Sequence, residues 1–305
     1  MRVILFSLAL CLMTTSSHAS AATPIRLVIH GGAGTIDRAR LSAEREAEYT
    51  AALAIALAAG HAVLERGGSS MDAVIAAITV MEDSPLFNAG RGAVFNHDGR
   101  NEHDASIMDG ATRGAGAVAA VGVIRNPIRA AEAVMRYSPH VMLTGAGAEA
   151  FAREQGLEIV DPSWFRTEER WRQLQKAIAG ERIERDHDAQ PAGAYREDDK
   201  RGTVGAVALD RHGNLAAGTS TGGLTNKRYG RIGDSPVIGA GTWADNRSVA
   251  VSATGTGEMF IRTAAAHSVA ELVRLVGKTA ADAADATLAE VAAIGGDGGL
   301  IVLDA

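Results

Sequence analysis

An abrupt change from a charged stretch to an apolar run constrains the fold of this chain more than any other feature of its sequence. Residues 181–200 carry many charges, contain a proline and a glycine, and show no apolar periodicity. Such a stretch cannot bury enough surface to order itself. Val204–Leu209 follows almost at once and is wholly apolar, which predicts a buried strand. A surface linker therefore has to enter the interior of a sheet at about Thr203.

Thr203 is also a candidate nucleophile, because it is preceded by a small residue, Gly202. If the chain cuts itself between them, Thr203 becomes an N-terminal threonine whose free α-amine can act as the general base. An α-amine has a pKa of about 7.7–8.0, so part of it is unprotonated at neutral pH. The alternative is a threonine that merely begins a buried strand, and the tripeptide Gly-Thr-Val does not decide between the two.

Five further motifs stand around this junction and favour a functional role for Thr203. The motifs are His30–Thr35, Pro85–Gly92, Gly218–Gly223, Gly230–Pro236 and Ser252–Glu258. Together they resemble the plant-type asparaginase/isoaspartyl peptidase family of N-terminal-nucleophile hydrolases, from about Arg26 to the last residue. The resemblance implies an α+β fold, a four-layer αββα sandwich in which Thr203 begins a central strand.

The order of the expected elements also indicates two sheets with helices outside, because strands and helices come in groups and not as βαβ repeats. Strands are predicted at residues 26–29, 105–108, 115–124, 141–144, 204–209, 215–219, 249–253 and 300–303. Helices are predicted at residues 41–65, 71–81, 127–137, 148–155, 162–179, 258–276 and 279–293.

The resemblance implies a catalytic constellation around Thr203. Thr221, on the next strand of the family pattern, orients the nucleophile hydroxyl. Thr254 and Gly255 form the oxyanion hole, one with a hydroxyl and the other with a backbone N–H. Asn88 supports the nucleophile region. The structural alternative for Thr221 is one threonine among several hydroxyl residues in a turn. For Thr254 and Gly255 it is a glycine-rich turn between a strand and a helix.

Arg231 and Asp234 indicate the substrate class. They stand three residues apart in a glycine-bracketed loop. A guanidinium binds a carboxylate bidentately and a carboxylate accepts hydrogen bonds from an ammonium, so this pair can hold one free amino-acid head group. The β-carbonyl of asparagine or of a β-aspartyl dipeptide then faces Thr203. The alternative is a surface ion pair in a turn.

A structural sodium ion is also implied by the resemblance, held by main-chain oxygens of one loop, while no cofactor is expected for catalysis. Arg91 stands where relatives usually carry an aliphatic residue. The positions that correspond to the ligands are Met81, Glu82, Ser84, Phe87, Ala89 and Arg91.

Residues 1–21 read as a secretory signal, with a positive start, a short apolar core and a small-residue cleavage site. The mature protein is therefore expected in the periplasm or outside the cell, without Cys11, the single cysteine. No other stretch is expected to reach the length of a membrane span, so no membrane partner is expected. The net charge of −6 argues against nucleic acid as a partner.

The expected products of self-cleavage are an α subunit, residues 22–202, and a β subunit, residues 203–305, which together form one αββα domain. The end of the α subunit, about 181–202, is expected to be disordered. The resemblance further implies a dimer of αβ heterodimers. Relatives continue past the final strand with another one, so the strand at 300–303 is expected to leave an unpaired edge.

The leading interpretation is a self-cleaving hydrolase of β-aspartyl (isoaspartyl) dipeptides and L-asparagine. A glycosylasparaginase-type enzyme, which hydrolyses N-acetylglucosaminyl-asparagine, shares the nucleophile, Thr221, Arg231 and Asp234. A third interpretation is an inactive periplasmic amino-acid-binding protein that keeps the Arg231/Asp234 pair and never cleaves. Histidine is the competing general base, and His30 and His103 are the histidines nearest the motifs.

Overall fold

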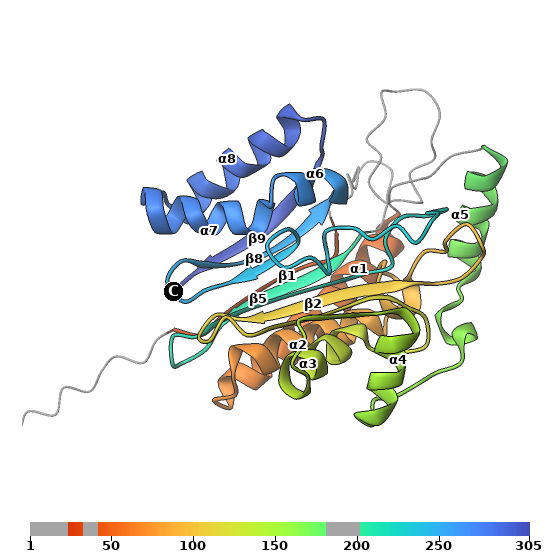
Figure 1. Ribbon diagram of the computed structural model, residues 1–305, viewed down its shortest axis with the longest axis horizontal. Coiled ribbons are helices and arrows are strands. Elements are labelled where there is room, and N and C mark those ends of the chain that lie inside the picture. Colours follow the sequence, from red (N-terminus) through yellow and green to blue (C-terminus); the bar gives the residue numbers. More distant parts are fainter. Residues whose placement is uncertain (1–23, 33–41, 181–201) are drawn as a thin grey trace, which may run out of the picture.

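The computed structural model describes residues 24–32, 42–180 and 202–305. Within these ranges, a six-stranded sheet has the order β1-β5-β6-β2-β3-β4 and a three-stranded sheet has the order β7-β8-β9. The two sheets face each other, and helices cover the outer face of each (Figure 1). The four-layer αββα sandwich expected from the sequence is therefore confirmed.

The strands are β1 (Arg26–His30), β2 (His103–Asp109), β3 (Ala115–Val121), β4 (Met142–Thr144), β5 (Val204–Leu209), β6 (Leu215–Thr221), β7 (Thr242–Ala244), β8 (Val249–Gly255) and β9 (Gly298–Asp304). The α-helices are α1 (Ala43–Glu65), α2 (Ser70–Glu82), α3 (Pro127–Tyr137), α4 (Gly145–Glu154), α5 (Glu168–Ala179), α6 (Gly257–Arg262), α7 (Ala265–Val276) and α8 (Ala280–Ala293), with 3-10 turns η1 (Gly90–Gly92) and η2 (Pro162–Phe165).

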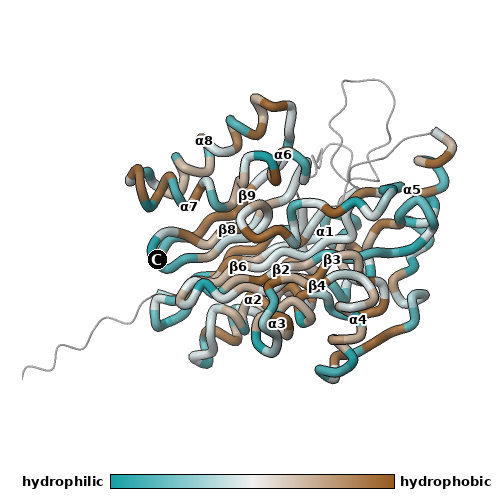
Figure 2. The backbone as a smooth tube through the Cα atoms, in the orientation of Figure 1, coloured by the Kyte–Doolittle hydropathy of each residue, from teal (hydrophilic) through white to brown (hydrophobic). Residues whose placement is uncertain are grey.

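Alternation along the strands divides the core into layers. On β5, Val204, Ala206 and Ala208 join the core beneath α1–α3, whereas Val207 and Leu209 join the core between the two sheets. This is the period of two that a strand imposes on its side chains. A third core layer lies between β8 and helix α7. Apolar colours in Figure 2 follow the strands and the helices packed on them.

Toward one end of the strands, the core between the sheets changes from apolar to polar. Five side chains from both sheets form a hydrogen-bonded group that we call the hydroxyl layer: His30, Ser106, Thr219, Thr242 and Ser252. His30 Nε2 lies 3.0 Å from Ser252 Oγ, which lies 2.7 Å from Thr219 Oγ1. Thr242 donates to Thr219 at 2.6 Å, and Ser106 lies 2.8 Å from Thr242. Because buried hydroxyls need partners, this layer fixes how the sheets face each other.

Two predicted helices are each interrupted in the structure. The predicted helix 258–276 is wrong as one element, because Ala264 adopts a left-handed conformation with φ 46° and separates α6 from α7. The predicted helix 162–179 is the 3-10 turn η2 followed by α5, which Thr167 caps by accepting from the Arg170 N–H. Strand β7, only three residues long, was not predicted at all.

Helix α1 corrects the expectation that no stretch beyond the N-terminus reaches membrane length. In the part of the chain that the structure describes, it is the one helix long and apolar enough to cross a membrane, by length and composition alone. It packs, however, along α2 and against β1. Ala56, Gly60 and Leu64 are buried on that side. We interpret α1 as an outer-layer helix of the sandwich.

Strand β9 forms an edge of its sheet, since β8 is its one paired neighbour among the described residues. This agrees with the expected unpaired edge. The expected signal, residues 1–21, and most of the expected linker, residues 181–201, lie outside the described residues.

Candidate active site

Strand register brings Thr203, Thr221 and Asp104 into one row across three neighbouring strands. Val204 pairs with Ser220, so Thr203 stands beside Thr221, and Thr221 pairs directly with Asp104 of β2. Residues paired across antiparallel strands share a face of the sheet. The alternation described above puts this catalytic row on the face toward the second sheet, one step beyond the hydroxyl layer.

Hydrogen bonds hold the two threonines of the row in place. Thr203 Oγ1 donates to Thr221 Oγ1 at 3.0 Å, and Thr221 Oγ1 also accepts the Gly223 N–H at 3.0 Å. Asn88 fixes the same turn, because its Nδ2 donates to the Gly223 carbonyl at 2.8 Å while its Oδ1 accepts from Val94 N. The structure thus brings together Thr203, Thr221 and Asn88, as expected from the sequence.

Thr254 and Gly255 end strand β8 in the second sheet. Gly255 lines the pocket that Thr203 and Thr221 line, whereas Thr254 is buried and is not among the lining residues. Gly255 has φ 152°, and a Cβ there would collide with the Asp297 carbonyl and lie 2.6 Å from Gly298 Cα. Glycine is therefore required at Gly255, because these neighbours occupy the space that a side chain would need.

Arg231 and Asp234 also line this pocket. Glu258, at the start of α6, holds the guanidinium: Arg231 Nε donates to Oε1 at 2.8 Å and Nη2 donates to Oε2 at 3.0 Å. A Cβ on Gly257 would lie 2.8 Å from both Arg231 Nη2 and Asp234 Oδ1. The two charged groups of the pair therefore converge over Gly257.

The Asp234 carboxyl is buried, with 5% of the residue exposed, and burial raises its pKa to about 6 although the Arg231 charge acts in the opposite direction. Among the described residues, its Oδ2 has no hydrogen-bond partner. A buried acceptor without a partner is costly. A substrate ammonium placed here would satisfy it.

The pocket is small in this uncut chain, in which Gly202 and Thr203 are joined by a peptide bond. Its volume is about 20 Å³, room for about one water molecule. Gly202 is buried, and a Cβ on Gly32 would lie 2.5 Å from Gly202 Cα. The segment after β1 thus packs directly on the residue that precedes the nucleophile. The pocket is lined by Asn88, Thr203, Thr221, Gly223, Leu224, Arg231, Gly233, Asp234, Ser235 and Gly255.

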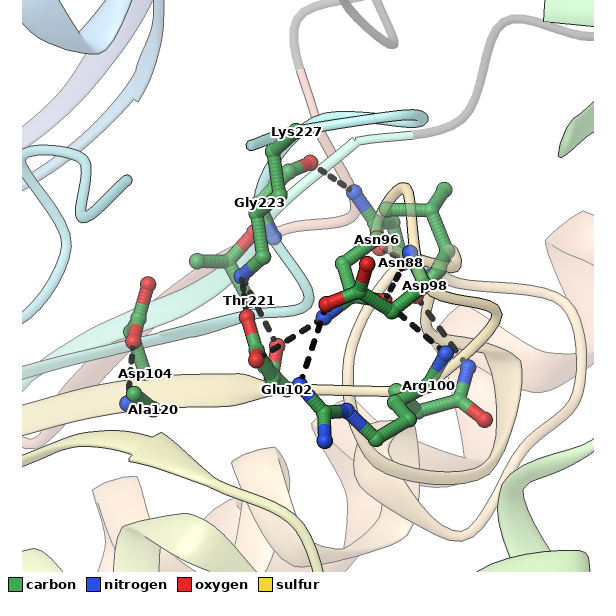
Figure 3. Close-up of polar contacts among 12 residues, drawn as sticks. Asn88, Asn96, Asp98, Arg100, Glu102, Asp104, Ala120, Thr221, Gly223 and Lys227 are labelled. Carbon is green, nitrogen blue, oxygen red and sulfur yellow. Dashed lines mark hydrogen bonds and ion pairs between the residues drawn. The ribbon is translucent and has the colours of Figure 1, made fainter. Parts of the chain in front are cut away.

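Sequence reasoning missed three charged residues around this pocket: Asp104, Lys227 and Glu258. Asp104 Oδ1 accepts from Ala120 N at 2.8 Å (Figure 3), and burial raises the pKa of this carboxyl. Lys227 has 2% of its side chain exposed and pairs with Glu102. Glu258 could have been selected, because it ends a glycine-rich motif, whereas Asp104 and Lys227 stand among polar and charged neighbours that give no local signal.

The two candidate histidines lie away from the Thr203 hydroxyl. His103 is buried against Phe165, with ring centroids 4.3 Å apart. Burial and the Lys227 charge lower its pKa to about 3, so it stays neutral. On β2 it is one residue from Asp104 and points to the other face of the sheet. His30 belongs to the hydroxyl layer and pairs with Gly205, two residues beyond Thr203.

In the loop expected to hold sodium, main-chain carbonyls pack closely against two glycines. Gly90 has φ 51°, and a Cβ there would collide with the Glu82 carbonyl oxygen, whereas one on Gly92 would collide with the Phe87 carbonyl oxygen. The carbonyl oxygens of Glu82 and Phe87 therefore lie close to the short turn η1. The Arg91 side chain turns away and stacks 4.9 Å from the Trp164 ring. No cluster of three metal-binding side chains occurs in the described ranges.

The Glu82 side chain lies under the other face of β6, next to the catalytic row. Its Oε1 accepts from Ser220 Oγ at 2.6 Å and from Ile128 N at 3.0 Å. Burial raises its pKa to about 8, so this carboxyl is protonated in the folded protein at neutral pH.

Glu82→Gln is expected to stabilise the protein increasingly as pH rises. The unfolded chain ionises this group above about pH 4.3, whereas the folded chain keeps the proton up to about pH 8. The wild-type free energy of unfolding therefore falls across this window, by up to about 5 kcal/mol, and glutamine removes the loss. Urea unfolding at pH 5, 7 and 9, in an uncut Thr203→Ala background, measures it. Glu290→Gln, exposed on α8, is the control; an equal gain at all three pH values would contradict burial as the cause.

Comparison with known proteins agrees with this geometry. The asparaginase family model matches residues 23–305. The isoaspartyl peptidase of Salmonella typhimurium is 51% identical over 279 residues, covering 91% of this chain and 88% of its own length. That of Escherichia coli is also 51% identical, covering 91% and 86%. The human isoaspartyl peptidase/L-asparaginase is 44% identical, covering 78% and 73%. The chain belongs to the asparaginase family, within the plant-type N-terminal-nucleophile hydrolases that its motifs resemble.

Proposed function

We propose that this protein is a self-activating amidohydrolase that cleaves β-aspartyl dipeptides and L-asparagine. One observation carries the proposal: beside the Thr203 hydroxyl, Arg231 and an unsatisfied, buried Asp234 oxygen line the same pocket. This is a carboxylate site and an ammonium site next to a nucleophile. The names of the relatives, isoaspartyl peptidase and L-asparaginase, support the same activity.

Activation begins with Thr203 itself. Its Oγ attacks the Gly202 carbonyl carbon, the C–N bond to Thr203 breaks, and the acyl group moves from nitrogen to oxygen. Water then hydrolyses the ester, which releases the Gly202 carboxylate and a free Thr203 α-amine. The burial of Gly202 against Gly32 supports this step, because it holds the carbonyl next to the hydroxyl. Before the cut, the Thr203 nitrogen is an amide and cannot serve as a base.

In the activated protein, Arg231 binds the substrate α-carboxylate and Asp234 its α-ammonium. Thr203 Oγ attacks the β-carbonyl while the α-amine takes the hydroxyl proton and passes it to the leaving amine. The Thr254 hydroxyl and the Gly255 N–H stabilise the oxyanion. Water hydrolyses the resulting aspartyl ester and aspartate leaves. Thr221 orients the nucleophile, and Asn88 supports the turn beside it.

We further propose a mature form of two chains, residues 22–202 and 203–305, assembled as a dimer of αβ heterodimers in the periplasm or outside the cell. The apolar, small-residue character of residues 1–21 supports export. A structural sodium ion would bind main-chain oxygens at Met81, Glu82, Ser84, Phe87, Ala89 and Arg91, a proposal supported by the convergence of carbonyls on η1.

Two measurements test the proposed function. On a denaturing gel the purified protein is expected to separate into two chains, whereas an amino-acid-binding protein that never cleaves stays one band. Initial rates are then compared for asparagine, a β-aspartyl dipeptide and N-acetylglucosaminyl-asparagine. Hydrolysis of the first two is expected; a preference for the third would favour a glycosylasparaginase, and two bands with no hydrolysis would contradict the proposal.

A further inference from the structure

A second, larger cavity lies beside the catalytic pocket and has no role in the chemistry described above. Its volume is about 560 Å³. It is lined by Asn96, His97, Asp98, Arg100, Glu102, Lys227, Arg228, Tyr229 and Gly230. Most of these residues carry charged or hydrogen-bonding side chains, so the cavity suits a polar ligand.

The cavity and the catalytic pocket lie between the same two segments of the chain. One segment contributes Asn88 to the pocket and residues 96–102 to the cavity; the other contributes Gly223 and Arg231 to the pocket and residues 227–230 to the cavity. Hydrogen bonds join the segments along the way, from Asn226 N to Phe95 O and from His97 N to Lys227 O. The catalytic pocket and the cavity therefore lie along the same interface between two chain segments.

Lys227 lines the cavity and lies near Gly223, which lines the catalytic pocket. A Cβ on Gly223 would lie 3.0 Å from the Lys227 Nζ, and Gly223 N is itself hydrogen-bonded to Thr221 (Figure 3). Thr221, Gly223 and Lys227 therefore follow one another from the nucleophile toward the cavity. A β-aspartyl dipeptide carries its C-terminal carboxylate about 4–6 Å beyond the scissile carbonyl carbon, so it extends farther from Thr203 than asparagine does.

The Lys227 ammonium has more N–H donors than the contacts with Glu102 use. It donates to the Glu102 carbonyl oxygen at 3.1 Å, and its ion pair with Glu102 Oε2 is long, at 3.7 Å. An ammonium has three N–H donors, and this one has 2% of its side chain exposed. Asp104 is a second acidic neighbour, since the Lys227 charge opposes the rise that burial causes in the pKa of that carboxyl. The N–H groups that do not bond to Glu102 can donate to the carboxylate of a ligand in the cavity.

The remaining charges leave the cavity cationic. Asp98 pairs with Arg100 at 3.1 Å, and Glu102 accepts from Asn96 at 2.8 Å in addition to Lys227. Arg228 adds a further positive charge at the exposed rim. Beside it, the Tyr229 ring is 98% exposed and offers an apolar surface to a side chain.

We propose that this cavity binds the leaving-group amino acid of a β-aspartyl dipeptide, with its C-terminal carboxylate on the Lys227 ammonium. The inference rests on the proposed function. In the proposed function Arg231 and Asp234 hold the aspartyl half in the catalytic pocket, which Gly223 also lines, and the cavity lies between the same two chain segments as this pocket. Asparagine, whose leaving group is ammonia, does not reach it.

The test compares β-aspartyl-leucine with its C-terminal amide, which differs only in the missing negative charge, and uses asparagine as a substrate that ends before the cavity. In the wild-type mature protein, KM for the free acid is expected to be at least about tenfold lower than KM for the amide, the effect of one charge-assisted hydrogen bond. Lys227→Gln is expected to lower this ratio to about threefold, the part that Arg228 contributes. Arg228→Gln, at the rim, is expected to reduce the wild-type ratio by about threefold.

Arg153→Gln, exposed on α4, is the matched control and should keep the wild-type ratio. Because the ratio is internal to each protein, a variant that folds or matures less well still reports it. Equal KM for acid and amide in the wild type would overturn the inference while leaving the proposed function intact, and it requires no variant. Lack of hydrolysis of all three substrates would overturn the proposed function and this inference with it.

Discussion

Thr203→Ala is expected to remain a single chain and to lose at least about 10⁴-fold in kcat for both asparagine and β-aspartyl dipeptides. The variant has no hydroxyl to attack the Gly202 carbonyl, so the acyl shift does not begin. Without the cut it also lacks the free α-amine that serves as base. One substitution therefore removes the nucleophile directly and the base indirectly. A denaturing gel and steady-state rates measure the two effects.

Thr203→Ser is the matched control, since it keeps the hydroxyl and should still mature into two chains. Mass analysis of the wild-type fragments gives an independent check, because the new N-terminus should be Thr203. A different N-terminus, or a Thr203→Ala protein that still separates into two chains, would show that the nucleophile lies elsewhere.

Asp234→Asn should mature normally and then lose about 10²–10³-fold in kcat/KM. Asparagine has nearly the same shape, but it cannot balance the charge of a substrate ammonium brought into this buried site. Self-cleavage is spared because the Gly202–Thr203 bond presents no ammonium to Asp234. The expected pattern is two chains on a gel with a large rise in KM. Unchanged KM for both substrates would show that Asp234 does not hold the head group.

The pH profile separates the roles of Asp234 and the α-amine. Substrate binding needs ionised Asp234, whose pKa is raised to about 6 by burial, so kcat/KM should fall as pH drops through about 6. The Thr203 amine adds a second acid-side ionisation near about 7.7–8.0. Asp234→Asn should remove the lower step alone. His30→Gln is the control: a cleaved variant that loses the upper step would transfer the base role to histidine.

Elements with a strong local pattern could be predicted from the sequence. The strand predicted at 204–209 has the same first and last residues as β5. An apolar run of this length between polar flanks is typical of a buried strand. Strand β6 was predicted to end at Thr219 and continues to Thr221, where its pairing with β2 decides its length. Thr203, Thr221, Arg231 and Asp234 could be selected because their motifs are recognisable in one segment each.

What could not be predicted depends on partners far away in the chain. Strand β7 is too short to show a period and exists through its pairing with β8. The break at Ala264 interrupts a sequence that is otherwise typical of one helix. Asp104 and Lys227 gain their significance from cross-strand register and from loops that meet in space, and no local pattern encodes either.

The catalytic row has a consequence for quality control during biogenesis. The row takes one residue from each of three strands. If one strand shifted its register by one residue, Thr203 or Thr221 would point to the face of the sheet that packs on the helices. A precursor with such a slip would lose the geometry around Thr203 and would be unable to cut itself. If self-cleavage occurs as proposed, only chains with the correct strand pairing are cut, so the fraction of cut chains on a gel reports the fraction with the correct register. Processing yield is then an assay of folding fidelity that needs no substrate.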